Sequence, residues 1–224
     1  MKHYIIYLIL FLLTGTAQAK NVNLDSLYNC LDKEIMKSDE YVRDKQARID
    51  PMLRRYLATP DKPSRHQLAW ELYKAYESFM NDSALHYLYI CVSLSKETGQ
   101  TTMLQSDYIA LAHQYAAAGF YNEALKYLNA IEHNRLSGQQ LIDYYFCCNH
   151  LYGEMGYYSK DDELKERSYQ LSNLYRDSLC NLLPPTSNLY LWRKIVELCT
   201  NRDYKRAMQL CDRWLNQVPN NSPE

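Results

Sequence analysis

Five aromatic and histidine side chains are the residues of this sequence best suited to bind a ligand. They are Tyr73, His113, Phe146, His150 and Trp192. Aromatic rings stack on sugar rings and on apolar peptide side chains, and imidazole nitrogens add directional hydrogen bonds. These residues lie far apart in the sequence, so only a fold that brings regularly spaced segments together could unite them in one site.

Motifs for metal binding and catalysis are missing from the sequence. None of the six histidines belongs to an HxxxH or HExxH motif. No GxSxG, phosphate-loop or GxGxxG motif occurs. The acidic run Asp161–Glu163 stands at an expected helix start, where carboxylates are favoured by the helix dipole and face solvent. We therefore predict no catalytic residue, no metal ligand, no cofactor and no enzyme activity.

The elements that would position the ligand-binding residues are recurrent helix pairs. In the segment 105–131, Ala112, Gly119 and Ala124 occupy positions 8, 15 and 20 of a 34-residue pattern, with large apolar residues between them. The two alanines allow two antiparallel helices to approach closely, and Gly119 supplies the flexible turn. The segment resembles a tetratricopeptide repeat.

The same pattern recurs elsewhere in the chain. Ala84 and Ala207 take the place of Ala124 in a first and a fourth copy, while the third copy has Asp161 there. The third copy keeps Tyr145, Cys148, Tyr152, Gly156 and Tyr158. We expect its second helix to begin late and to run to about Leu183, where Pro184 and Pro185 end it.

Few glycines and no sustained alternation of apolar and polar residues exclude a β-rich fold. We predict an all-α, tetratricopeptide-like helical-repeat solenoid of about four helix pairs over residues 64–221. Its first helix follows Pro63 and has Ser64 and Gln67 at capping-box spacing. Residues 22–58 predict one or two capping helices, with Pro51 breaking or kinking the second.

In stacked repeats, the first helix of each pair lines a concave face. The positions expected there are His66, Ala69, Tyr73, Tyr76, Ile109, His113, Ala116, Ala117, Asp143, Phe146, His150, Leu189, Trp192 and Val196. The aromatic and histidine residues among them predict a groove for a peptide or a sugar. The alternative is that each of these residues only packs between repeats.

The first nineteen residues have the features of an export signal. Lys2 and His3 precede a short apolar stretch, and Ala17–Ala19 match the small-x-small pattern of signal peptidase sites. Cleavage would make Lys20 the first mature residue and place the chain in the periplasm. An uncleaved N-terminal anchor is the alternative.

Charge and cysteine content restrict the partners and the redox state. The net charge is −1 with both signs interspersed, so no nucleic-acid-binding face is expected. Seven cysteines leave at least one thiol unpaired within the chain. Cys30, Cys91, Cys199 and Cys211 fall at apolar helical positions, and the adjacent Cys147 and Cys148 project in different directions. We favour buried thiols over a structural disulfide.

The C-terminal residues look like the start of another helix. Ser222 could cap it, with Pro223 and Glu224 in its first turn. The preceding helix would then expose Met208 and Leu215. We therefore expect the chain to be the front part of a longer protein.

Several stretches together resemble one family: LDSLYNCLDKEI, RDKQARID, ELYKAYESFMNDSALHYLYICVSLSKETG, LYGEMGYYSKDDELKERSYQLSNLYRDSLCNLLPP and NRDYKRAMQL. They are similar to the membrane-anchored bacterial transcriptional regulators that carry tetratricopeptide repeats and a C-terminal domain of unknown function. The resemblance spans residues 22–224 and covers only the front part of such proteins. It implies a periplasmic repeat region and, beyond it, an inner-membrane helix, a coiled coil and a DNA-binding end.

These observations predict an exported binding or sensing module. The expected partner is a peptide or protein segment, or a second copy of the chain, with no nucleic acid bound by this part. Contact with a membrane is expected only through a downstream part or an uncleaved signal. Two alternatives are a helical enzyme acting on glycan or cell wall, which needs two carboxylates in one cleft, and a scaffold without a ligand.

Overall fold

The computed structural model describes residues 24–216, and within them the chain is helical throughout. The described part holds ten α-helices and one short 3-10 helix, and no strand. The chain divides into two compact units, residues 1–51 and 52–224. The expected signal segment 1–19, its cleavage site before Lys20 and the expected helix start at Ser222–Glu224 lie outside the described residues.

The first unit contains α2 (Leu24–Ile35) and most of α3 (Ser38–Ala58). The apolar residues Leu24, Leu27, Leu31 and Ile35 of α2 are all more than half exposed. Of the two predicted effects of Pro51, a break is wrong, because α3 continues through this residue, and a kink stays a prediction. Proline removes one backbone hydrogen bond from the helix interior, and the other turns of the 21-residue helix are retained. The capping role of residues 22–58 stays a prediction.

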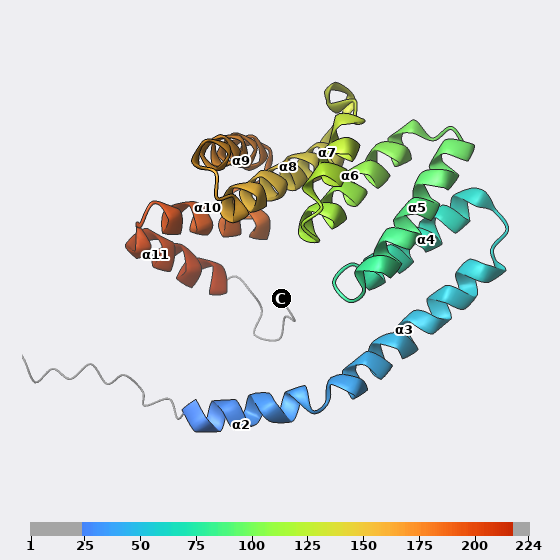
Figure 1. Cartoon of the computed structure of the whole chain (residues 1–224), viewed down its shortest axis with the longest axis horizontal. Coiled ribbons are helices and arrows are strands. Elements are labelled where there is room, and N and C mark those ends of the chain that lie inside the picture. Colours follow the sequence, from blue (N-terminus) through green and yellow to red (C-terminus); the bar gives the residue numbers. More distant parts are fainter. Residues whose placement is uncertain (1–23, 217–224) are drawn as a thin grey trace, which may run out of the picture. The chain divides into compact units, whose positions relative to one another are not determined.

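The second unit contains four helix pairs in sequence order (Figure 1). The first two are α4 (Lys62–Tyr76) with α5 (Asn81–Glu97) and α6 (Thr101–Ala117) with α7 (Tyr121–Asn129). The 3-10 helix η1 (His133–Arg135) leads to α8 (Gly138–Tyr158), which pairs with α9 (Asp162–Leu182). The last pair is α10 (Asn188–Thr200) with α11 (Tyr204–Leu215). Helix α6 also packs against α5 and α8. The prediction of an all-α helical-repeat solenoid is confirmed.

Small residues lie where the repeat pattern places them. Ala112 on α6 and Ala124 on α7 are both 0 % exposed and belong to one core cluster with Leu128 and Ile131. Ala84 on α5 and Ala207 on α11 are buried as well. Methyl side chains at these positions leave room for the partner helix, which explains why the pattern survives in three copies.

The turn after α6 shows why the pattern requires a glycine. Gly119 has φ +81°, a conformation that side chains with a Cβ disfavour. The next residue, Phe120, donates its backbone N–H to the carbonyl of Tyr115 at 2.9 Å, which caps the end of the helix. The turn after α10 has the same bond, from Asp203 to the carbonyl of Leu198 at 2.8 Å. There the left-handed position is Arg202, with φ 59°.

The start of α4 differs from the prediction. The carboxylate of Asp61, not the hydroxyl of Ser64, caps the helix, and it accepts a hydrogen bond from the backbone N–H of Ser64 at 2.9 Å. Pro63 lies inside the first turn, where its missing N–H needs no partner. The helix therefore begins two residues before Ser64, at Lys62.

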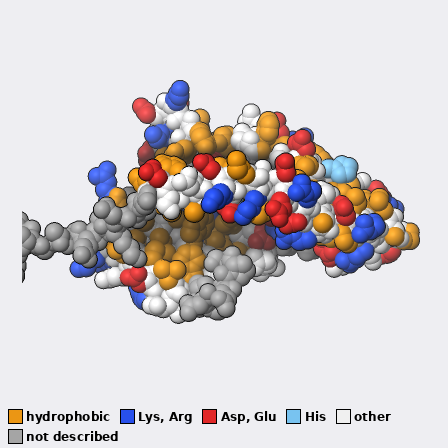
Figure 2. Space-filling model, turned by 90° about the horizontal axis from the view of Figure 1, so that it is seen from below, with side chains coloured by type: hydrophobic (Ala, Val, Ile, Leu, Met, Phe, Trp, Pro, Cys, Tyr) orange, Lys and Arg blue, Asp and Glu red, His pale blue; other side chains and the backbone are white. Residues whose placement is uncertain are grey.

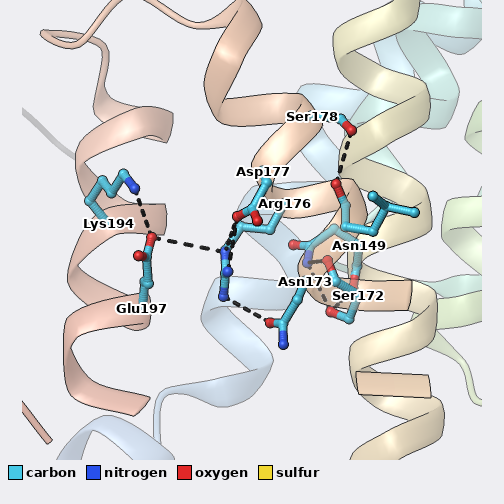
Figure 3. A network of polar contacts seen from close by, with 9 residues as sticks. Asn149, Ser172, Asn173, Arg176, Asp177, Ser178, Lys194 and Glu197 are labelled. Carbon is cyan, nitrogen blue, oxygen red and sulfur yellow. Dashed lines mark hydrogen bonds and ion pairs between the residues drawn. The ribbon is translucent and has the colours of Figure 1, made fainter. Parts of the chain in front are cut away.

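The third helix pair replaces the alanine contact with other small residues. Gly156 lies inside α8, not in a turn, and a Cβ there would come within 2.9 Å of the Tyr169 ring on α9. Nearby, Ser172 and Asn149 exchange hydrogen bonds at 2.8 to 2.9 Å in the buried interface (Figure 3). Asp161 caps α9 by accepting the backbone N–H of Leu164 at 2.8 Å, which confirms the solvated helix start.

The cysteines divide by burial. Cys91, Cys147, Cys148 and Cys180 are buried, and all seven thiols are free. Burial raises the pKa of the Cys147 thiol well above its ordinary value, so it behaves as an inert apolar group. Cys30 and Cys199 are exposed, which contradicts their expected apolar surroundings.

On the face shown in Figure 2, basic and acidic side chains alternate without a large area of one sign.

Candidate functional site

A cavity of about 240 Å³ lies against the first helices of three successive pairs, α4, α6 and α8. We call it the groove cavity. Its lining residues are Trp70, Tyr73, Lys74, Glu77, Ser106, Ile109, Ala110, His113, Asp143 and Phe146. Three of the five predicted ligand-binding residues, Tyr73, His113 and Phe146, therefore lie in one cavity.

Tyr73 and Glu77 form the first wall of the groove cavity. The Tyr73 ring is buried, and its hydroxyl donates to a Glu77 carboxylate oxygen at 2.8 Å. Burial, followed by the bond to Glu77, raises the pKa of Tyr73, so its hydroxyl stays protonated. Burial opposes ionisation of Glu77, but the bonds from Lys74 and Tyr73 outweigh it and lower the pKa of Glu77. This wall is a preorganised hydrogen-bonding surface.

His113 lines the groove cavity, whereas the predicted site residue His150 does not line it but lies next to His113. The His113 ring centroid lies 5.5 Å from that of Phe146 and 5.2 Å from that of His150. Burial, together with the neighbouring His150, lowers the pKa of His113 from 6.5 to about 4. Burial also lowers the pKa of His150.

Arg193, which the sequence reasoning missed, does not line the groove cavity but lies against the ring of Phe146, which does. Its guanidinium carbon lies 4.9 Å from the ring centroid of Phe146 and 4.2 Å from that of Trp192. Trp192 itself is 40 % exposed and does not line the groove cavity. Arg193 lies against both rings and so links Trp192 to Phe146. A basic residue next to an expected groove aromatic was the available signal.

Trp70, Lys74 and Glu77 also line the cavity and were missed, although Trp70 and Glu77 follow helical spacing from Tyr73. Conversely, some expected groove residues belong to the interior: His66, Ala69, Tyr76 and Ala116 are buried. Tyr76 stacks on Tyr87 of α5 at 5.7 Å instead of facing the groove. Three residues beyond Tyr73 correspond to about 300° around the helix, and the small difference from a full turn directs Tyr76 to the second helix of its own pair.

A buried polar cluster lies beside the groove cavity. His66 Nε2 is 3.0 Å and 3.1 Å from the two Asp107 oxygens, and the Ser95 hydroxyl donates to Asp107 at 2.6 Å. Potential metal-ligand atoms of His66, Cys91 and Asp107 lie within 4.8 Å of one another. The sequence spacing does not reveal this group, since its members come from three helices. Its carboxylate is already satisfied by His66 and Ser95, so we assign the cluster to joining α4, α5 and α6.

Two further observations concern the exposed apolar residues of α11 and the length of the apolar helices. Met208 and Leu215 on α11 are 68 % and 69 % exposed, as expected for an uncovered last helix. None of the helices in the described part of the chain is both long and apolar enough to cross a membrane.

Comparison with known proteins gives one result that covers most of the chain. No curated protein and no solved structure matches it. Residues 35–224 match the family described as the SusR N-terminal TPR domain. The matched range includes all four helix pairs of the described structure and the groove cavity. The chain therefore belongs to the SusR N-terminal TPR domain family.

Proposed function

We propose that this chain is a binding module that holds a protein segment in the groove cavity. The observation that carries the proposal is the convergence of Tyr73, His113 and Phe146, from three successive first helices, on one cavity. Helical-repeat proteins use such concave surfaces to bind extended partners. The tetratricopeptide family assignment supports the same class of partner.

The lining of the cavity suits a peptide segment that carries both apolar side chains and hydrogen-bonding groups. The rings of Trp70, Tyr73 and Phe146 offer apolar contact area. The Glu77 and Asp143 carboxyl groups and the His113 imidazole add groups that can orient a ligand by hydrogen bonds. An extended peptide carries both apolar side chains and backbone donors, so it can engage the two sets together.

The main rival is a glycan-processing enzyme. It would need two carboxyl groups, one on each side of a scissile bond. Glu77 and Asp143 both line the cavity, but Glu77 already accepts bonds from Tyr73 and Lys74. The Asp143 carboxylate oxygen accepts a bond from Gln139 at 2.8 Å, so both carboxyl groups already have partners within the chain. We therefore favour binding without catalysis.

The proposal includes export and a role in regulation. The apolar start and the Ala17–Ala19 pattern support a mature chain that begins at Lys20 in the periplasm. The family description supports a place at the N-terminal end of a longer protein, and the resemblance to membrane-anchored regulators supports a role in regulation. Mass analysis of the protein from its native host tests the export step. An intact Met1 on protein from the cytoplasm would contradict it.

A peptide-display selection tests the binding function directly. The full chain is offered a random peptide library and, in parallel, a glycan array. We expect enriched peptides whose binding weakens by on the order of 30-fold in Phe146→Ala, the loss typical of a central aromatic contact. Phe120→Ala is the matched control, since Phe120 is an exposed phenylalanine outside the cavity lining. Glycan binding, glycan cleavage or no ligand in either arm would reject the proposal.

A further inference from the structure

Arg193 is a buried cation without a charge partner in the described part of the chain. Only 8 % of the Arg193 surface is exposed, and the buried Nε atom has no hydrogen-bond partner among the described residues. No ion pair joins it to a carboxylate of the described residues. A buried charge that lacks a partner is costly, and a bound ion or ligand that supplies the missing interaction is one explanation for such a group.

The neighbouring arginine shows that acids are available close by. Arg176 on α9 donates to Asp177 at 2.9 Å and to Asn173 at 2.8 Å, and it lies 4.0 Å from Glu197 (Figure 3). Lys194, next to Arg193, pairs with the same Glu197 at 2.8 Å. The acids at this junction of α9 and α10 are therefore occupied by Arg176 and Lys194.

Aromatic rings hold Arg193 in place without neutralising it. Its guanidinium lies over Phe146 and against Trp192. Such contacts orient the planar group and favour the cation, but a ring accepts no in-plane hydrogen bond from Nε–H. Burial lowers the pKa of Arg193 to about 10, so the group remains charged at neutral pH. Its unfilled requirement is an in-plane anionic acceptor.

The groups around Phe146 leave this requirement unmet. His113 and His150 face Phe146 or each other, and neither carries a negative charge in any protonation state. Arg193 is close enough to disfavour the protonation of both imidazoles. The surroundings of Phe146 on the α10 side are therefore electropositive, whereas the α4 side of the cavity holds the Glu77 carboxylate.

We propose that Arg193 binds a carboxylate of the protein segment held by the groove. The inference rests on the proposed binding function and names the chemistry of the bound segment. A carboxylate is planar and can accept two parallel N–H bonds from a guanidinium, which would satisfy the orphan Nε. The carboxylate is either the C-terminus of the segment or an Asp or Glu side chain.

Matched peptides separate these two sources. A peptide enriched by display is synthesised with a free C-terminus, with an amidated C-terminus, and with each acidic side chain replaced by its amide. Binding of each form to the full chain is measured by calorimetry. We expect one of these neutralisations to weaken binding about tenfold or more, the loss typical of a charged hydrogen bond.

Variants of the protein test whether Arg193 is the group that recognises the carboxylate. In Arg193→Met the acidic form and its neutral counterpart should bind equally, and Arg193→Lys should restore only part of the difference. Arg176→Met serves as the control and should preserve the preference for the acid. Thermal unfolding verifies that each variant is folded. As a direct readout, the Nε–Hε nuclear magnetic resonance signal of Arg193 should shift with the acidic peptide and not with its neutral form.

The outcomes distinguish the two proposals. If peptides bind in a Phe146-dependent way but all neutral forms bind as well as the acidic one, the carboxylate inference is wrong and the binding function stands. The carboxylate inference is also wrong if Arg193→Met keeps the full preference for the acid. If no peptide binds the unmodified chain, both proposals fail.

Discussion

The Asp107 carboxylate on α6 contacts the His66 imidazole on α4 through both of its oxygens, at 3.0 Å and 3.1 Å. The two residues belong to different helix pairs, and Asp107 is fully buried. Ser95 of the intervening helix α5 donates to the same carboxylate at 2.6 Å. One carboxylate thus joins the first helices of two successive repeats to the second helix between them.

Replacing Asp107 should therefore uncouple the first two pairs. In Asp107→Ala, the polar atoms of His66 and Ser95 stay buried without a partner, and we expect a loss of about 3 kcal/mol in the free energy of unfolding. Denaturant unfolding measures the loss. Asp212→Ala, at an exposed aspartate of α11, is the control and should change stability by less than about 0.5 kcal/mol. Equal losses of stability in the two variants would contradict the proposed role of the cluster in joining the helices.

The close approach of α6 and α7 predicts a second asymmetry. Ala124→Leu should destabilise the chain by about 1–3 kcal/mol or more, because Ala124 is fully buried and has no room for a larger side chain. Ala117→Leu, at an exposed position of α6, should cost little. Thermal melting of both variants is the measurement. Similar shifts of the melting temperature would show that the repeat register is misassigned.

The α8–α9 interface provides a matched pair of glycines. A Cβ at Gly156 would stand 2.9 Å from the Tyr169 ring, whereas at Gly153 the nearest atom is the Ser172 hydroxyl at 3.4 Å. Alanine stabilises a helix interior by about 1 kcal/mol relative to glycine. We expect Gly153→Ala to be neutral or stabilising and Gly156→Ala to lose about 1 kcal/mol or more, since the ring must move. The opposite order of stabilities would contradict the close packing of Tyr169 against Gly156.

The left-handed turn residue Arg202 offers a stabilising substitution. Its φ of 59° costs a residue with a Cβ roughly 1 kcal/mol, and glycine avoids this cost. Arg202→Gly should therefore raise the free energy of unfolding by up to about 1 kcal/mol. Lys205→Gly, in the exposed first turn of α11, should lower it by a similar amount. A loss of stability in Arg202→Gly would show that its side chain contributes more than the turn geometry does.

The depressed pKa of His113 predicts a loss of stability in acid. Its pKa is about 4 in the folded chain against 6.5 ordinarily, so between these values the unfolded chain binds more protons. Stability therefore rises with pH across this window, and acidification from pH 6.5 to 4 should remove on the order of 3 kcal/mol. His113→Gln should flatten this part of the profile, measured by unfolding at several pH values. An equally steep profile in the variant, or flattening in the exposed-residue control His86→Gln, would assign the effect to other groups.

The helices and their pairing were predictable because their causes are local. The spacing of Ala112, Gly119 and Ala124 specifies two helices and a left-handed turn within about twenty residues, and the other copies repeat it. The cap at Asp61 and the predicted break at Pro51 were misjudged, since several short-range signals compete at helix ends and only their sum decides.

The binding site depended on contacts between repeats, which the sequence pattern does not encode. Tyr73 and Tyr76 have similar sequence environments, yet one lines the groove cavity and the other stacks on α5. A small rotation of the helix decides between them, and packing of the whole pair sets that rotation. Local sequence signals were enough to define the helix pairs and the aromatic residues of three first helices. Folding of the whole chain was needed to bring Arg193 over Phe146 and to join Asp107 to His66, because each contact links helices whose relative positions follow from the packing of several elements at once.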